Sequence, residues 1–349
     1  MNILSLFDGM SCGQIAINRL GIKYDNYFAS EIDKYAIQVT KANYPDTKHI
    51  GSVVDVKGEN LPKIDLLIGG SPCQSFSFCG KKNGMSTACS QEILTLEHYL
   101  ELKADGFEFD GQSYLFWEYM RLLKETKPKY FLLENVLMGQ KWQKILSQTI
   151  GIDPIKINSS LLSGQSRNRL YWTNIGTTNN NLFGIDQVGI IQPQDKGILL
   201  RDILQQNVSD KYFINQLNKN YSLKPMRINK KFTQLDSKDK SICLCQKNSL
   251  SNWVGDYVSE SFVNSNKPIQ ENKSAYYIDG KSTTLDLESE IKNLYEGVKI
   301  RRLTPIECER LQTVPDNYTN HVSDVQRYRM LGNGWTVDVI AYIFKHMEL

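Results

Sequence analysis

Cys73 is the residue of this chain whose setting most favours a nucleophile. It stands in the stretch GGSPCQS (residues 69–75), directly after the apolar run IDLLI (residues 64–68). Such a run is typical of a buried parallel strand, so Cys73 is expected just beyond a strand's carboxyl end, where open α/β sheets hold their active sites. A thiol fixed by an X-Pro turn has the exposure and rigidity that a nucleophile needs. A lone cysteine is more often a small, buried apolar residue than a nucleophile, so the residues around Cys73 must decide between these two interpretations.

A carboxyl group and two guanidinium groups are expected near the same edge. Residues 129–133 are a second buried run, and Glu134 follows them directly. Arg167 and Arg169 lie in the strand-like segment 165–172, whose alternation places both on one face. Paired arginines suit a polar substrate edge or a phosphate, although an isolated pair is more often a solvated strand face.

The amino terminus has the pattern of a cofactor-binding βαβ unit. Residues 2–7 predict a strand, 8–13 a tight turn and 14–20 a helix. Gly9 and Gly13 allow a ligand close to the backbone, and free N–H groups at the helix start suit a carboxylate or phosphate. The glycine spacing departs from GxGxxG and does not favour a dinucleotide.

Glu31 follows a second predicted strand, residues 24–30, about 20 residues after the glycine loop. At that place a carboxylate accepts hydrogen bonds from both hydroxyls of a ribose. The alternative is that Glu31 only caps the predicted helix 33–42. Further patterns predict a strand-like element at 49–56, helices at 91–103 and 115–124, and a long loop, 79–112, that suits a mobile lid. The fold class is therefore α/β, a doubly wound and mostly parallel sheet.

Composition bounds the class of protein. The chain has 349 residues, 41% apolar and 23% charged, which suggests two domains or one domain with a large insertion. It has no run of 18 apolar residues and no leader pattern at its start, so an intracellular protein is expected. Seven cysteines without a CxxC pair, and four scattered histidines, argue against a disulfide framework and a zinc site. A net charge of +3 permits nucleic-acid binding without requiring it.

The motifs together resemble those of the C5-cytosine DNA methyltransferases that use S-adenosylmethionine. The resemblance covers residues 1–172 and 299–349, with the motifs in family order. They are the FDG…G cofactor loop (7–13), the ribose acid Glu31, the SPCQ catalytic loop (71–74), the ENV motif (134–136), the QxRxR motif (165–169), the RLTPxExxRLQ segment (302–312) and the closing GNGWTV (332–337). Serine before Pro-Cys, and the helix at 115–119, are similar to the subgroup that includes the animal de novo methyltransferases.

The resemblance implies a Rossmann-like methyltransferase fold, the cofactor S-adenosylmethionine with S-adenosylhomocysteine as product, and no metal. It implies that Cys73 attacks carbon 6 of a flipped cytosine, that Glu134 hydrogen-bonds or protonates N3, and that Arg167 and Arg169 hold the base and its phosphate. The implied cofactor contacts are Phe7, Asp8, Gly9, Gly13, Glu31, Ile32, Ser52, Val53, Pro72, Asn333, Trp335 and Thr336. Ser52 departs from the family, which usually has Asp there for the adenine amino group; Asp55 is a candidate substitute.

A division into two domains is expected, with DNA in the cleft between them. Residues 1–176 plus 326–349 would form the catalytic and cofactor-binding domain, and 177–325 a smaller target-recognition domain. No family motif occurs in 177–300. Residues 211–247 hold nine Lys and Arg against two Asp, whereas 256–296 hold four Lys against eight acidic residues. The basic run, interleaved with aromatic residues, could follow phosphates or be a solvated face.

The implied partner is double-stranded DNA, bound by a monomer in the cytoplasm of a bacterial cell or phage-infected host, without a membrane; a cognate restriction endonuclease is a candidate partner. Two other hypotheses stay open. A tRNA cytosine-5 methyltransferase shares these motifs, but it usually carries a Cys-Phe-Thr signature that is missing here, and the 177–300 insert is large for it. A non-catalytic DNA-binding paralogue would have no chemical need for Cys73, Glu134 and both arginines together.

Overall fold

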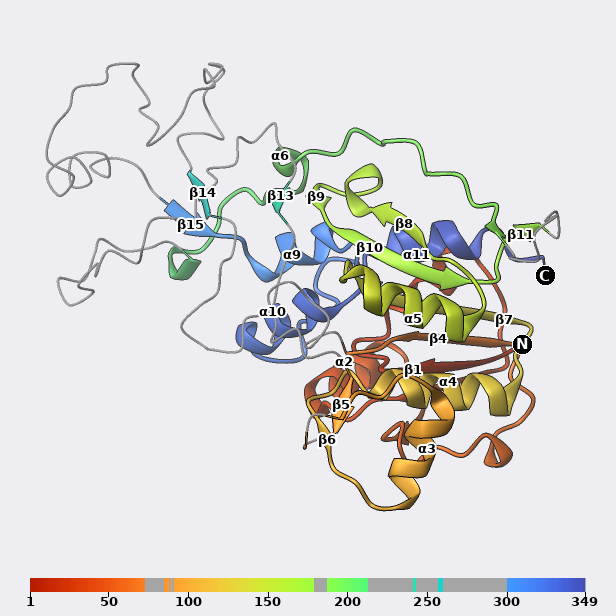
Figure 1. The fold of residues 1–349 in the computed structure, drawn as a ribbon. Helices are drawn as coiled ribbons and strands as arrows, with labels where there is room; N and C mark the ends of the chain where they lie inside the picture. The colour runs from red at the N-terminus through yellow and green to blue at the C-terminus, as the bar shows by residue number, and fades with distance from the viewer. Residues whose placement is uncertain are drawn as a thin grey trace, which may run out of the picture.

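The protein is built on a seven-stranded sheet, shown in the computed structural model of Figure 1. The structure describes residues 1–72, 85–87, 89, 91–178, 187–212, 241–242, 257–259 and 300–348. The strands of the main sheet are β1 (Asn2–Leu6), β2 (Asn26–Ser30), β3 (Lys48–Gly51), β4 (Leu66–Gly70), β7 (Tyr130–Val136), β8 (Ile155–Asn158) and β10 (Asn168–Thr173). Four of them, β1, β2, β4 and β7, are largely apolar runs buried on both faces, as central parallel strands require.

The strand order is β3-β2-β1-β4-β7-β10-β8. The first five strands are parallel, and β10 runs antiparallel to both β7 and β8. The chain leaves β1 in one direction to build β2 and β3 and later returns to add β4 and β7 on the other side. This reversal at β1 and β4 makes the sheet doubly wound, and it is where such sheets open a crevice for ligands. The predicted fold class is confirmed.

Helices cover both faces of the sheet (Figure 1). The helices are α1 (Cys12–Arg19), α2 (Lys34–Asn43), α3 (Leu96–Ala104), α4 (Leu115–Thr126), α5 (Gln140–Ile150), α6 (Leu200–Ile203), α9 (Pro305–Leu311), α10 (Asp324–Asn333) and α11 (Val337–Phe344), with 3-10 turns η1 (Gly58–Asn60), η2 (Ser159–Leu161) and η3 (Asp210–Tyr212). Successive strand residues point to opposite faces, so Ile3 packs with α1, α2 and α11, while Leu4 packs with α3, α4 and α5. None of the described helices is long and apolar enough to span a membrane.

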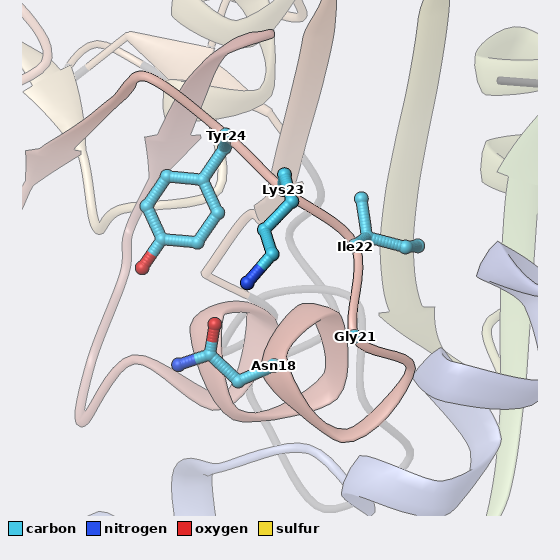
Figure 2. Close-up of a pocket in the computed structure, with 5 residues that line it drawn as sticks. All are labelled: Asn18, Gly21, Ile22, Lys23 and Tyr24. Carbon is cyan, nitrogen blue, oxygen red and sulfur yellow. The ribbon is translucent and has the colours of Figure 1, made fainter.

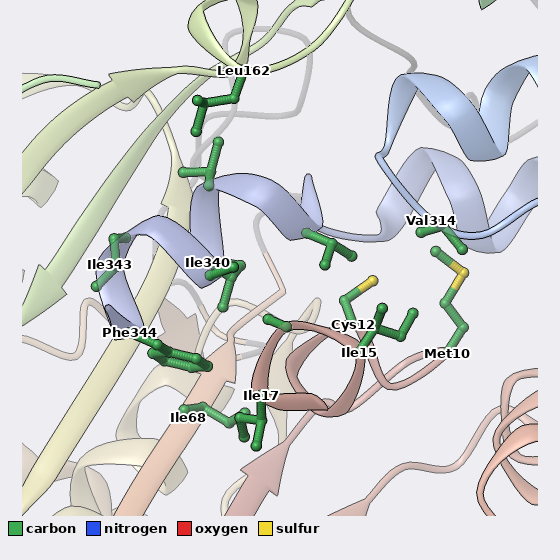
Figure 3. Packing of buried hydrophobic residues seen from close by; sticks show 14 of the residues in the cluster. Met10, Cys12, Ile15, Ile17, Ile68, Leu162, Val314, Ile340, Ile343 and Phe344 are labelled. Atoms are coloured by element: carbon green, nitrogen blue, oxygen red, sulfur yellow. The ribbon is translucent and has the colours of Figure 1, made fainter. Parts of the chain in front are cut away.

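The carboxyl-terminal segment returns to the amino-terminal cofactor unit. Side chains of α11, among them Ile340 and Phe344, meet Ile15 and Ile17 of α1 in one apolar cluster (Figure 3). Arg19 of α1 ties the two helices with an ion pair to Asp338. The closing motif is thereby brought beside the glycine loop, more than 300 residues away in sequence.

Residues near the expected domain boundary pack into the same core. Leu200 and Ile203 of α6 and Leu311 of α9 join the cluster that holds α1 and α11. Most of 213–299 lies outside the described residues, so the division at 176 and 326 stays a prediction. Short pairs flank the main sheet: β5 (Ser86–Thr87) with β6 (Phe109–Asp110), β9 (Gln165–Ser166) with β13 (Ser241–Ile242), β11 (Thr177–Thr178) with β12 (Gln187–Val188), and β14 (Tyr257–Ser259) with β15 (Ile300–Arg302).

Three local expectations differ from the structure. The strand-like element predicted at 49–56 is a strand only to Gly51, because β3 spans Lys48–Gly51 and a loop follows it. Helix α3 begins five residues later than the predicted start at 91, because Thr95 caps it by accepting a hydrogen bond from the His98 amide. The segment 165–172 is two strands, β9 and β10, with Arg167 between them.

Candidate active site

Strands β4 and β7 carry the candidate site at their carboxyl ends. Gly70 of β4 is the register partner of Glu134 in β7, and Val136 of β7 is the partner of Arg169 in β10. Both polar side chains therefore reach the same edge. Ser71 and the half-buried Pro72 follow β4 directly and point the chain toward this edge. Cys73 itself lies outside the described residues.

Glu134 is held by two donors. Its Oε1 accepts an ion-pair contact of 2.9 Å from Arg169 Nε, and its Oε2 accepts a hydrogen bond of 3.1 Å from the Trp335 indole Nε1. The residue is 9% exposed, so both contacts form largely away from solvent, where electrostatic interactions are strong. Both carboxylate oxygens thus act as acceptors in these contacts.

The second arginine of the motif points elsewhere. Arg167 is 3% exposed, and its guanidinium donates to the Gly332 carbonyl at 3.3 Å and to the Gly334 carbonyl at 3.0 Å. Its described partners belong to the closing motif, so Arg167 anchors that segment to the sheet. Arg167 lies between β9 and β10, so the expectation that strand alternation places both arginines on one face stays a prediction. A substrate role for Arg167 stays a prediction.

Ser71 is fixed to the neighbouring strand. The Asn135 amide nitrogen donates to Ser71 Oγ at 3.0 Å and to its carbonyl at 3.3 Å. Both residues are almost fully buried. Asn135 therefore pins the start of the loop that leads to Cys73, a role that its place in the ENV motif alone does not reveal.

Glu31 lies at the end of β2 beside the glycine loop. Its Oε2 accepts a hydrogen bond of 2.8 Å from the Gly9 amide, and its Oε1 accepts bonds from the amides of Ile32 and Asp33. Asp33, not Glu31, is the N-cap of α2, since its side chain accepts from the Tyr35 and Ala36 amides. Glu31 is therefore not the cap of α2. Its hydrogen bonds join the glycine loop to the end of β2. Ribose binding stays a prediction.

The glycine loop adopts left-handed backbone conformations at three positions. Phe7, Gly9 and Ser11 have φ angles of 56°, 59° and 63°. Asp8 within the loop accepts a hydrogen bond of 2.8 Å from Tyr27 through Oδ1, whereas its Oδ2 is buried and has no partner among the described residues. Burial raises the pKa of Asp8 from 3.8 to about 6.

Close packing explains why glycine stands at positions 13 and 70. A Cβ at Gly13 would clash with Ile68 and lie 3.0 Å from the Tyr27 hydroxyl. A Cβ at Gly70 would lie 2.8 Å from Trp335 Nε1 and 3.1 Å from Glu134 Oε2. Trp335 therefore joins the cofactor loop to the catalytic edge. The sequence places Trp335 with the cofactor only and does not predict its contact with Glu134.

The remaining predicted cofactor contacts differ in exposure. Ile32 is 71% exposed although it is a large apolar residue, and Asn333 at the end of α10 is also exposed. Val53 is 5% exposed and packs in the core, so only its backbone is available. Thr336 is 2% exposed, and its hydroxyl donates to Gln312 and accepts from Ser159. Ser52 follows β3 directly and is half-buried.

Two surface hollows lie away from these residues. One, of about 370 Å³, is lined by Asn18, Gly21, Ile22, Lys23 and Tyr24 (Figure 2). It precedes β2, at the amino edge of the sheet, whereas Glu31 and Glu134 lie at the carboxyl edge. The other, of about 280 Å³, is lined by residues 205–212 and by parts of α9 and α10.

A doubly wound sheet with a glycine loop, an acid after β2 and an ion-paired glutamate at the end of β7 defines an α/β enzyme with a nucleotide-like cofactor. The chain belongs to the C-5 cytosine-specific DNA methylase family, whose sequence model matches residues 1–101 and 103–349. It is thus a DNA (cytosine-5-)-methyltransferase, and the family's chemistry implies the use of S-adenosylmethionine and a DNA substrate.

Several named methyltransferases are similar to this chain along nearly its whole length. It is 26% identical to the orphan methyltransferase M.SPBetaI of Bacillus phage SPbeta, covering 99% of this chain and 97% of that protein. It is 28% identical to the type II methyltransferase M1.ScrFI of Lactococcus lactis subsp. cremoris, covering 99% and 77%. Among solved structures, a mutant of Spodoptera frugiperda DNMT2 has a TM-score of 0.64 at 20% identity, covering 99% of this chain and 98% of that one. Entamoeba histolytica EhMeth has a TM-score of 0.63 at 17% identity, covering 100% and 99%. At these identities the structures support the fold alone.

Proposed function

We propose that the protein methylates carbon 5 of a cytosine flipped out of a specific duplex sequence, through a covalent bond between Cys73 and carbon 6. The observation that carries this proposal is Glu134 held between Arg169 and Trp335, beside its strand partner Gly70, from which the chain continues to Cys73. A base inside the stack cannot reach such a buried edge, so extrusion is required.

The residues would divide the chemistry as follows. The Cys73 thiolate forms a bond to carbon 6, and the electron pair of the 5,6 double bond makes carbon 5 nucleophilic while N3 gains a hydrogen bond or proton from Glu134. Arg169 keeps the Glu134 carboxyl aimed at the base. After methylation, loss of the carbon-5 proton re-forms the double bond and expels the thiolate. Arg167, buried against the closing motif, would support the site's framework.

The residues around the glycine loop fit S-adenosylmethionine, which supplies the methyl group when bound. The Glu31 carboxylate lies at the strand end where a ribose would be held, and Gly9 leaves the backbone open to a close approach. The exposed Ile32 offers an apolar surface to an adenine ring, and the unpartnered Asp8 Oδ2 is a buried acceptor. Phe7, Gly13, Asn333 and Trp335 complete the lining.

We further infer a monomer acting on double-stranded DNA in the cytoplasm of a bacterial cell or phage-infected host. Relatives named from Bacillus phages and from Bacillus subtilis support this setting. A cognate restriction endonuclease is a candidate partner, because several relatives are named type II methyltransferases.

Covalent capture tests the proposal. Duplex DNA carrying 5-fluorocytosine at the target should become joined to the protein in the presence of S-adenosylmethionine, because fluorine replaces the proton whose loss releases the enzyme. Cys73→Ser should abolish capture, since a serine hydroxyl is largely un-ionised, and Glu134→Gln should slow it by roughly 10²- to 10⁴-fold. Cys89→Ser, which changes an exposed cysteine, is the matched control.

Bisulfite sequencing of DNA from expressing cells supplies the target sequence for this test. Capture of tRNA but not DNA would overturn the DNA assignment. Sequence-specific binding without capture would indicate a non-catalytic protein, and capture that survives Cys73→Ser would remove this cysteine from the mechanism.

A further inference from the structure

Glu118 is a charged residue on the buried face of α4. Its side chain is 0% exposed and stands between Trp117 and Tyr119, which are equally buried. A carboxylate in an apolar core is costly unless it is paired and fully hydrogen-bonded. The groups that pair with Glu118 must therefore explain why a carboxylate is found at this buried position.

Three side chains satisfy Glu118. From α3, the Tyr99 hydroxyl and Lys103 Nζ donate to Oε1 at 2.5 Å and 2.6 Å. From α4 itself, Arg121 Nε donates to Oε2 at 2.7 Å. Burial and the bond to Glu118 raise the pKa of Tyr99, which keeps its hydroxyl a donor. Glu118 is thus the hub that orients Lys103 and Arg121.

Arg121, which Glu118 orients, also binds the loop that follows β3. Its Nη2 donates to the carbonyls of Val53 at 3.1 Å and Val56 at 2.8 Å, and Lys103 Nζ makes a longer contact of 3.4 Å with the Val54 carbonyl. Three carbonyls of a four-residue stretch are therefore held by side chains that Glu118 orients.

Glu125 fixes the far end of the same loop. It accepts from Arg121 Nη1 at 2.8 Å through Oε1, and through Oε2 from the Gly58 amide at 2.8 Å. The near end is fixed by Ser30, whose hydroxyl donates to the Gly51 carbonyl at 2.9 Å. The loop 52–58 is consequently clamped between the end of β2, which carries Glu31, and helix α4.

This loop starts with Ser52, where the family usually has Asp for the adenine amino group. A neutral hydroxyl makes a weaker hydrogen bond than a carboxylate does. The Val53 side chain is buried in the core, so recognition of adenine would depend on backbone groups of this loop and on Asp55, which the same loop carries. Backbone recognition depends on where the loop lies, and small misplacements are costly in a preorganised site.

We propose that Glu118 and Arg121 are positioning residues that hold the loop 52–58 against the adenine end of the cofactor. The proposal rests on the proposed function, because it assigns a cofactor to the site. Glu118 also joins α3 to α4, so the test must include a measurement that a purely structural role would not change.

The variant Arg121→Lys tests the proposal while it keeps the charge, since an ammonium group on a single stem cannot reach Val53, Val56 and Glu125 together. We expect the KM for S-adenosylmethionine to rise roughly three- to tenfold, as for the removal of one hydrogen bond. The KM for DNA, and kcat at saturating cofactor, should stay unchanged. Glu118→Gln should behave in the same way.

A binding measurement separates this positioning role from a general loss of rigidity in the protein. S-inosylhomocysteine carries a carbonyl oxygen where adenine has its amino group, so the wild type should prefer S-adenosylhomocysteine. In Arg121→Lys this preference should shrink by the same roughly three- to tenfold, whereas Glu31→Ala should weaken both ligands equally. Glu97→Gln, which removes an exposed negative charge between the same two helices without touching the loop, is the control.

The two proposals fail in different ways. A wild type that neither binds S-adenosylhomocysteine nor forms the 5-fluorocytosine adduct would overturn the proposed function. A wild type that does both, with an Arg121→Lys variant of unchanged KM and unchanged ligand preference, would overturn the positioning role alone. If Arg121→Lys does not fold, Glu125→Ala removes the acceptor of the Gly58 amide and carries the same expectation.

Discussion

Ionisation of Asp8 is unfavourable in the folded protein. Burial raises its pKa from 3.8 to about 6. Between these values the unfolded chain has lost the proton while the folded protein keeps it, so the free energy of unfolding falls as pH rises from about 4 to about 6 and is level above that. At about 1.4 kcal/mol per pKa unit, the decrease is at most about 3 kcal/mol.

Asp8→Asn should remove this fall, because asparagine cannot ionise and can still accept from the Tyr27 hydroxyl. Urea denaturation at pH 4.5 and at pH 8 measures the effect. The variant should gain up to about 2 kcal/mol over the wild type at pH 8 relative to pH 4.5, because only the part of the fall above pH 4.5 is sampled. Parallel profiles for wild type and Asp8→Asn would contradict the assignment.

Glu31 offers the sharpest test of cofactor binding. Glu31→Ala should weaken S-adenosylhomocysteine binding by roughly 1.5–3 kcal/mol, the range for a charged hydrogen-bonding group. Calorimetry on the folded variant measures it. Asp33→Ala removes the cap of the adjacent helix without touching the ribose position, so it should cost about 1 kcal/mol of stability and leave the affinity unchanged. An unchanged affinity in Glu31→Ala would exclude Glu31 from the site.

The sequence predicts single polar residues at strand ends better than it predicts their partners. Glu31 and Glu134 are expected at the sheet edge because each follows a buried apolar run. The bond from Trp335 to Glu134 joins residues 201 positions apart, and no periodicity reports such a contact. Arg167 illustrates the same limit, since its partners Gly332 and Gly334 arrive only when the chain end packs back.

At the scale of elements, strand β4 ends in Gly70, which packs tightly against residues of the site. Gly70→Ala would place a Cβ 2.8 Å from Trp335 Nε1 and 3.1 Å from Glu134 Oε2. The indole must then move off the carboxylate, so kcat should fall, by up to about 100-fold for a displacement near 1 Å. Stability should fall by about 1–3 kcal/mol, as in other overpacked sites.

Single-turnover methylation and urea denaturation measure the two effects of Gly70→Ala. Gly139→Ala is the matched control, since that glycine has a φ of −62° and nothing within 4 Å of an added Cβ. Because Gly139 is the N-cap of α5, the control should cost up to about 1 kcal/mol of stability, and it should leave single-turnover methylation unchanged. A Gly70→Ala enzyme with full activity would show that Trp335 is not needed on Glu134.

Element type is predictable from period and length, whereas element ends are not. The runs that form β1, β2, β4 and β7 are all expected as strands, because continuous burial is the mark of a parallel sheet. Helix α3 starts at Leu96 because Thr95 caps it, a choice that a side-chain bond settles locally. Pattern analysis does not predict that Glu118 is buried, because a charged residue on an apolar helix face is expected to be exposed. Its partners on α3 become known only from the structure.

At the scale of the whole molecule, Glu31 and Glu134 follow or end strands at the carboxyl edge of the sheet, and specificity is expected from residues 177–300, where no family motif occurs. Within that stretch, the basic run 211–247 holds nine Lys and Arg against two Asp. Phosphate contacts position a protein on DNA, whereas base contacts carry the sequence information. The basic run is therefore expected to contribute affinity without choosing the target.

Substituting Lys230 or Lys231 by Ala should weaken binding to all DNA sequences alike and flatten the salt dependence, by up to about 0.9 in the slope of log K against log salt for each phosphate that the protein no longer neutralises. Titrations from about 50 to 200 mM salt on target and non-target duplexes measure this. Lys63→Ala, at the exposed amino edge of β4 and remote from Glu134, is the matched control and should leave the slope as it is. If Lys230→Ala instead changed which sequence is methylated, with an unaltered salt slope, the basic run would read bases and the division of roles proposed for 177–300 would be wrong.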